Sequence, residues 1–144
     1  MHESSLSPCV HSILAAKIND EARAYEFYLR TARLDLDDYN NDTEDGLHIT
    51  SMAGTWMSIV EGFAGMRVRE GQLQFNPFLP GKWEAFSFSV IFRGAKLKVK
   101  ITEHGIEIKN DAAVSLTVKV RESTHQLAAY AEIKADDSVI WPAM

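Results

Sequence analysis

The spacing of apolar residues changes near Gly65, and no other feature of this sequence constrains the fold as strongly. Before Gly65 the apolar residues recur every three or four positions, which is typical of helices with one buried face. After it, apolar and polar residues alternate, which is typical of strands with one buried and one exposed face. The sequence therefore predicts an α+β fold in which N-terminal helices precede an antiparallel β-sandwich.

The first half predicts three helices. Ser7-Pro8 suits the start of the first, since serine caps free backbone N–H groups and proline is favoured in the first turn. Asp20 can cap a second helix after a very short break, so we expect an antiparallel helix pair. The acidic stretch Asp35–Gly46 is interpreted as a loop, and a third helix should run from about Thr50 to Phe63.

The second half predicts several short strands separated by turns at glycine, asparagine and aspartate. The segment Asn76–Trp83 holds two prolines and should form an irregular connection before the sheet. The first and third helices are apolar on more than one side, so they should pack on the sheet or on a larger helical body outside this sequence. The alternating apolar positions are Phe86, Phe88, Val90, Phe92, Leu97, Val99, Ile101, Ile106, Ile108, Val114, Leu116, Val118, Val120, Leu127, Ala129, Ala131 and Ile133.

Composition excludes several classes of partner. A formal net charge of -5 disfavours nonspecific binding to the phosphate backbone of nucleic acids. No apolar stretch approaches the roughly 20 residues of a membrane-spanning helix. Cys9 is the single cysteine, and the sequence begins without a basic or apolar signal region. We therefore expect a cytoplasmic protein that binds neither nucleic acid nor membranes.

Four long strings of the sequence are unusual: HESSLSP (His2–Pro8), ARLDLDDYNN (Ala32–Asn41), EDGLHITSMAGTW (Glu44–Trp56) and LQFNPFLPGKWEAFSFSVIFRG (Leu73–Gly94). In this order they resemble the C-terminal end of the glycoside hydrolase family 65 disaccharide phosphorylases, the maltose phosphorylase type in particular. The resemblance covers roughly residues 1–102, and the tail after it matches loosely.

The resemblance implies that residues 1–66 are the last helices of an α/α-barrel catalytic domain and that residues 67–144 are a C-terminal β-sandwich domain. It also implies a reversible, inverting phosphorolysis, such as maltose and phosphate to β-glucose 1-phosphate and glucose. Inorganic phosphate is then a co-substrate, and no cofactor is needed. The family's general acid, a glutamate, and its sugar-contacting lysine-glutamine pair lie upstream of the matching region. We therefore expect no catalytic residue here and no activity of this chain alone.

His48 is the leading candidate for a functional residue. It lies where the acidic loop enters the third helix, and helix N-termini favour anions through free N–H groups and the helix dipole. A protonated imidazole and the hydroxyls of Thr50 and Ser51 would add charge-assisted hydrogen bonds. By resemblance, this stretch binds phosphate in the phosphorylases. The alternative interpretation is that His48 merely caps the helix or is exposed in the loop.

Glu3, Ser4 and Ser5 are further candidates, because by resemblance they line the active-site end of the barrel. Without the resemblance they would be a capping segment at a frayed terminus.

No metal site is expected. Counted from Asp35, the acidic loop places Tyr39 and Asn40 at positions 5 and 6, where a calcium-binding EF-hand loop needs a ligand and a glycine. The histidines show no paired spacing typical of metal ligands. A solvated, self-capping loop is the interpretation we prefer.

The sequence also allows a function of another class, which is not enzymatic. The chain would then be a stand-alone carbohydrate-binding or oligomerisation module without catalysis, and a non-functional gene remnant is a third reading. Under any of these, exposed apolar helix faces would favour a homodimer. In a full-length phosphorylase, the partners would be the disaccharide and phosphate.

Overall fold

The computed structural model describes residues 6–38 and 41–135. The chain divides into two compact units, residues 1–63 and 64–144, and each is described by itself. We name them the helical unit and the β unit. They confirm the predicted α+β class, with helices first and a largely antiparallel β structure second. The predicted domain boundary between residues 66 and 67 stays a prediction.

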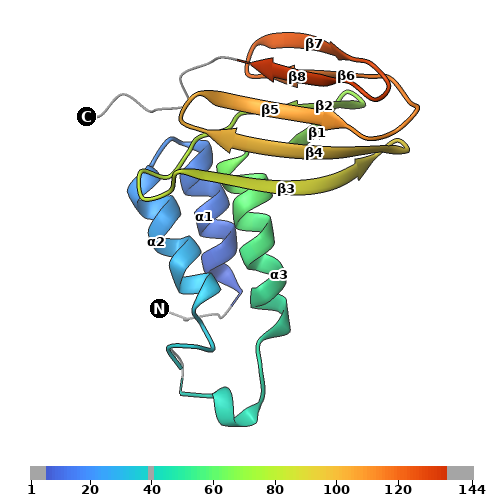
Figure 1. Cartoon of the computed structure of the whole chain (residues 1–144). Helices are drawn as coiled ribbons and strands as arrows, with labels where there is room; N and C mark the ends of the chain where they lie inside the picture. Colours follow the sequence, from blue (N-terminus) through green and yellow to red (C-terminus); the bar gives the residue numbers. More distant parts are fainter. Residues whose placement is uncertain (1–5, 39–40, 136–144) are drawn as a thin grey trace. The chain divides into compact units, whose positions relative to one another are not determined.

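The described part of the helical unit contains three packed α-helices (Figure 1). They are α1 (Ser7–Lys17), α2 (Glu21–Ala32) and α3 (Ile49–Met57), with a short 3₁₀ turn, η1 (Thr43–Asp45), before α3. Asp20 caps α2 as predicted, accepting a hydrogen bond from the Arg23 backbone N–H at 3.1 Å. Ser7 does not cap α1, because it is already the first helical residue and no side chain caps this end.

Small residues let the helices approach closely. The Ser12 hydroxyl on α1 donates a buried hydrogen bond to the Ala24 carbonyl of α2 at 2.8 Å. On α3, a Cβ added to Gly54 would lie 2.8 Å from the Cβ of Cys9, so only glycine fits there. The third helical segment ends at Phe63 as predicted, but its last six residues are π-helical, because α3 continues into η2 (Ser58–Phe63).

Part of the apolar surface of the helical unit is exposed. On α1 and its ends, Leu6, Val10, Leu14 and Ile18 follow one another at four-residue spacing and are all exposed. On α3, Ile49, Met52 and Trp56 are exposed as well. This matches the prediction that these two helices are apolar on more than one side.

The described strands of the β unit form two four-stranded sheets, with strand orders β1-β2-β6-β7 and β3-β4-β5-β8 (Figure 1). Within the described residues, β2 and β6 pair in parallel and every other pair is antiparallel. The parallel pair departs from the antiparallel meander that the sequence suggested. The strands are β1 (Arg67–Arg69), β2 (Gln72–Phe75), β3 (Ala85–Phe92), β4 (Ala95–Thr102), β5 (Gly105–Asn110), β6 (Leu116–Val120), β7 (Ser123–Leu127) and β8 (Glu132–Ala135).

One predicted strand is wrong. The alternation from Leu127 to Ile133 suggested a single strand, but the structure places a turn there, with Tyr130 at φ +55. Leu127 ends β7, and Ile133 belongs to β8 in the other sheet. The irregular connection at Asn76–Trp83 is confirmed, because no strand lies between β2 and β3.

Apolar side chains from both sheets form one buried core, as expected of a β-sandwich. On β4 the alternation is complete, with the lysines exposed and the intervening apolar residues buried. Burying each such side chain is worth about 1.5–3 kcal/mol. The fully buried large side chains in this core are Leu73, Phe75, Leu97, Val99, Ile101, Ile108, Val118, Val120 and Leu127.

Candidate functional site

His48 is the residue immediately before α3, in the N-cap position. Its backbone is not helical, at φ -83 and ψ 73, and its carbonyl accepts from the Ser51 N–H at 2.9 Å in the first turn. The His48 side chain does not cap the helix. The ring therefore stands beside the helix start and is available for other contacts, unlike in the capping interpretation.

Two carboxylates contact opposite edges of this ring. Asp35, in the turn after α2, lies 2.6 Å from His48 Nδ1 through Oδ1. Its Oδ2 accepts a hydrogen bond from the His48 backbone N–H at 2.9 Å. Asp42, just before η1, lies 3.4 Å from Nε2. Exposure of the side chains is 21% for His48, 13% for Asp35 and 38% for Asp42, so the Asp35 contact is the better shielded one.

These contacts raise the pKa of His48 above its usual value. The hydrogen bond to Asp35 is the largest cause, while partial burial acts in the opposite direction and Asp42 adds a smaller electrostatic contribution. A carboxylate at each edge stabilises the protonated ring because opposite charges favour the charged form. The raised pKa extends to higher pH the range in which the ring is an imidazolium, which is the state that an anion would bind.

The acidic loop around this site is tied down by its own side chains. The Asp38 carboxylate accepts from the Thr43 backbone N–H at 3.2 Å and from the Thr43 hydroxyl at 2.9 Å. Those bonds lower the pKa of Asp38. Arg33 makes a two-point contact with Asp37 at 2.8 and 2.6 Å. These internal contacts fit the self-capping loop of the sequence interpretation.

The other predicted phosphate-site residues are placed differently from one another. Thr50 is exposed in the first turn of α3, close in sequence to His48. Ser51 is buried, at 3% exposure, so its side chain belongs to the interior of the helical unit. Glu3, Ser4 and Ser5 lie outside the described residues.

Asp35 and Asp42 are the contacts that sequence reasoning missed. From the sequence, the acidic loop is considered as a binding site only for calcium, and that interpretation is rejected. Asp35 is 13 residues before His48, and the loop between them is rich in carboxylates. The only signal available was the acidic loop ahead of a histidine at a helix start, and it does not single out either aspartate.

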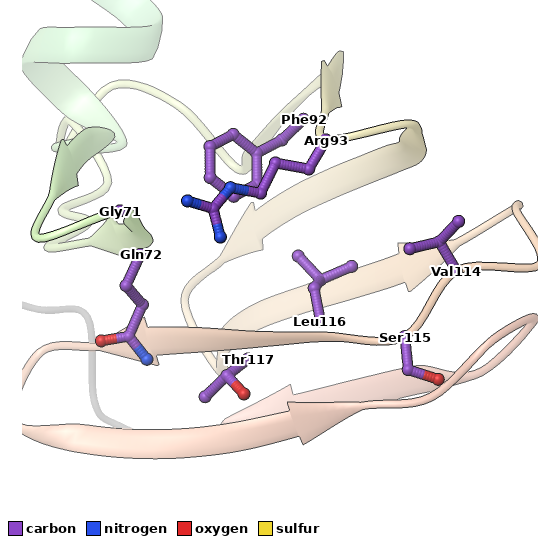
Figure 2. Close-up of a pocket in the computed structure, with 8 residues that line it drawn as sticks. All are labelled: Gly71, Gln72, Phe92, Arg93, Val114, Ser115, Leu116 and Thr117. Carbon is purple, nitrogen blue, oxygen red and sulfur yellow. The ribbon is translucent and has the colours of Figure 1, made fainter.

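The β unit has a separate pocket of about 370 Å³ (Figure 2). Figure 2 shows Arg93 beside the Phe92 ring, with its guanidinium carbon 5.4 Å from the ring centroid. Within the described part of the chain, this guanidinium has no hydrogen-bond or ion-pair partner. The lining residues are Gly71, Gln72, Phe92, Arg93, Val114, Ser115, Leu116 and Thr117.

The described residues contain neither a metal-binding cluster nor a membrane-spanning helix. In residues 6–38 and 41–135, no group of three or more histidine, cysteine, aspartate or glutamate side chains has a geometry that could hold a metal ion. No helix in the same ranges is long and apolar enough to span a membrane.

Both units resemble proteins of the same family. The glycosyl hydrolase family 65 central catalytic domain matches residues 1–57, and the family's C-terminal domain matches residues 66–127. Maltose phosphorylase of Bacillus subtilis is 57% identical over 72% of this chain. Alpha,alpha-trehalose phosphorylase of Geobacillus stearothermophilus is 44% identical over 88% of the chain.

A solved structure gives the same answer for the fold. This protein of the human microbiome, provisionally described as a kojibiose phosphorylase, is 39% identical and superposes over 94% of the chain with a TM-score of 0.85. The chain spans only 18% of that protein, and 14% and 16% of the maltose and trehalose phosphorylases. Matches to two domains of one family, together covering most of the sequence, show that this chain belongs to glycoside hydrolase family 65.

Proposed function

We propose that this chain is part of a disaccharide phosphorylase, with maltose as substrate, and that it supplies His48 to the phosphate-binding site. The observation that carries the proposal is the protonatable imidazole at the start of α3, held by Asp35. It lies within the segment matched by the family's central catalytic domain. The high identity to a maltose phosphorylase supports the choice of maltose over trehalose or kojibiose.

The chemistry explains why such a site is needed. In inverting phosphorolysis, a phosphate oxygen attacks the anomeric carbon of the sugar while the glycosidic C–O bond breaks. The departing sugar oxygen takes a proton from a general acid, which we assign to polypeptide outside this sequence. Phosphate takes the place of the water that a carboxylate base would activate in an inverting hydrolase, so the protein must hold an anion there. An imidazolium beside the positive end of a helix dipole suits that task.

Thr50 fits the same role through its exposed hydroxyl in the first turn of α3. Ser51 stays in the proposed phosphate-binding stretch by its place in the first turn of α3, although its side chain is buried and its N–H donates to the His48 carbonyl at 2.9 Å. Glu3, Ser4 and Ser5 remain proposed as lining of the active-site end. We also propose a cytoplasmic location, in keeping with the single cysteine.

A chimera tests the proposal. This chain would replace the matching segment of the Bacillus subtilis maltose phosphorylase, and phosphorolysis of maltose would be followed by release of glucose 1-phosphate. We expect activity in the chimera, with a His48→Gln version showing a KM for phosphate raised about tenfold or more. A folded, active chimera whose phosphate KM is unaffected by His48→Gln would contradict the proposal.

The isolated chain supplies a second test. Because the general acid is assigned to other polypeptide, we expect the 144-residue chain to release no glucose 1-phosphate from maltose and phosphate. Release at enzymatic rates would show that this assignment is wrong.

A carbohydrate-binding role without catalysis is the second candidate, and the pocket of the β unit favours it. An aromatic ring, a guanidinium and an amide, from Phe92, Arg93 and Gln72, line the same hollow, and such groups can contact both the apolar face and the hydroxyls of a sugar. Calorimetry with maltose in phosphate-free buffer distinguishes the two. Binding that is lost in Phe92→Ala would favour this candidate, and absence of binding would exclude it.

We further propose that two copies pair through the apolar row on α1. Leu14 and Ile18 are 51% and 74% exposed, and a row of this kind is typical of an interface. Light scattering should give the mass of a dimer, and that of a monomer for Leu14→Glu. A monomeric wild-type chain would contradict this pairing.

A further inference from the structure

The two carboxylates at His48 hold the ring in unequal ways. Asp35 makes two contacts, to Nδ1 at 2.6 Å and to the backbone N–H at 2.9 Å, and its side chain is mostly shielded from solvent. Asp42 makes one contact, to Nε2 at 3.4 Å, and is more exposed. Asp35 therefore fixes where the ring points, whereas Asp42 only touches its outer edge.

The strength of each contact determines what can be displaced. Moving Asp35 would break two short hydrogen bonds, one of them to the backbone. Within the described residues, Nε2 of His48 is the only partner of the Asp42 carboxylate, so moving it gives up a single long contact. The Nε2 edge is thus the one place on the ring where an external anion can replace an internal one.

An anion arriving at Nε2 meets the charge of Asp42 at the same edge. One N–H cannot serve two anions fully, and two like charges at contact distance repel each other. Phosphate and the Asp42 carboxylate are therefore competitors for the same donor, while Asp35 stays in place on the other edge.

We propose that Asp35 and Asp42 act in opposite directions on the phosphate site: Asp35 is a positioning residue that orients His48 toward phosphate, and Asp42 is a resident anion that phosphate displaces from Nε2. This inference rests on the proposed function, and it adds a competition between Asp42 and phosphate for His48. With no phosphate present, Asp42 keeps the imidazolium paired.

The experiment uses the 144-residue chain and three single variants. Asp35→Asn and Asp42→Asn each remove one carboxylate from the ring. Asp45→Asn is the matched control, because it removes the same charge from the same loop, and the structure gives its side chain no contact with His48. NMR of the His48 ring follows a pH titration first and a titration with inorganic phosphate second, at constant ionic strength.

Both tested variants should lower the pKa of His48, since each removes a negative charge that raises it. Their effects on phosphate should have opposite signs. We expect Asp42→Asn to bind phosphate about threefold more tightly than the wild type. We expect Asp35→Asn to bind it at least about threefold more weakly, and Asp45→Asn to bind it with nearly the wild-type affinity. A role in folding alone would not give opposite signs in two variants that shift the pKa in the same direction.

Different results would contradict different parts of this proposal. Weaker phosphate binding in Asp42→Asn overturns the competition, and unchanged binding with an unchanged ring orientation in Asp35→Asn overturns the positioning role. If phosphate shifts the His48 signals in no variant, the phosphate site itself is wrong and the proposed function loses its main support. Asp42 is half-buried and makes a single side-chain contact among the described residues, so Asp42→Asn should remain folded and still test the proposal even if Asp35→Asn unfolds.

Discussion

The two units differ in how far their apolar side chains are buried. The β unit buries both inner sheet faces in one core, with eight strands contributing to two sheets. The helical unit leaves a row of large apolar side chains exposed on α1 and places its tightest polar contacts in a loop. The difference is that the described strands bury their apolar faces against one another, whereas the described helices leave large apolar side chains at the surface.

The largest effect should come from truncating an isoleucine in each unit. Ile108 in the β core is fully buried, and Ile18 after α1 is 74% exposed. We expect Ile108→Ala to lower the free energy of unfolding by about 3 kcal/mol, because it removes apolar contacts and leaves a cavity. Ile18→Ala should change it by less than about 0.5 kcal/mol. Urea unfolding followed by circular dichroism measures the free energy of unfolding of both variants. Equal losses of stability would contradict the difference in apolar burial between the two units.

A glycine at the start of the β unit provides the next test. Gly65 has φ +59, and a Cβ added there would lie 2.4 Å from the carbonyl oxygen of Asn76. Gly65→Ala should therefore cost more than about 2 kcal/mol, from a left-handed backbone and a clash with main-chain atoms. Gly94 is the matched control, since its φ is +81 but no atom lies within 4 Å of an added Cβ.

For Gly94→Ala we expect a loss of about 1 kcal/mol, from the backbone conformation alone. Thermal and urea unfolding of both variants would compare them. Equal losses would show that the close approach at Gly65 does not hold in solution, and that the β unit is less tightly packed there than described.

The smallest effect concerns pH and the helical unit. Because the pKa of His48 is raised in the folded chain, its contribution to stability is complete below its usual value of 6.5. That contribution is lost as the pH rises through the higher, folded-state pKa. The urea midpoint of the wild type should therefore fall over this range, relative to His48→Gln. Parallel pH profiles for the two proteins would show that the Asp35 contact is not formed in solution.

Much of the fold was predictable because its signals are local. Strict alternation of apolar and polar residues predicted β3 and β4, which pair in one sheet, and Asp20 marked the start of α2. The parallel pairing of β2 with β6 was not predictable, because it joins segments far apart in the sequence and leaves no local pattern. The turn at Tyr130 was hidden by an alternation that continues through it.

The candidate site was predictable only in part. His48 was identifiable from its place at a helix start and from the resemblance to the phosphorylases. Its partners were not, because the acidic loop offers several carboxylates at similar sequence distances. Which of them reaches the ring depends on how the turn after α2 folds, and that turn is set by contacts such as Asp38 with Thr43.

The central claim is that His48, held by Asp35, binds phosphate. Its most direct measurement is a titration of the chain with inorganic phosphate, observed at the His48 ring by NMR near neutral pH. The account predicts a saturable shift of the Nε2 signal and a further rise of the His48 pKa when phosphate is bound. Ring signals and a pKa that stay constant throughout the titration would contradict it.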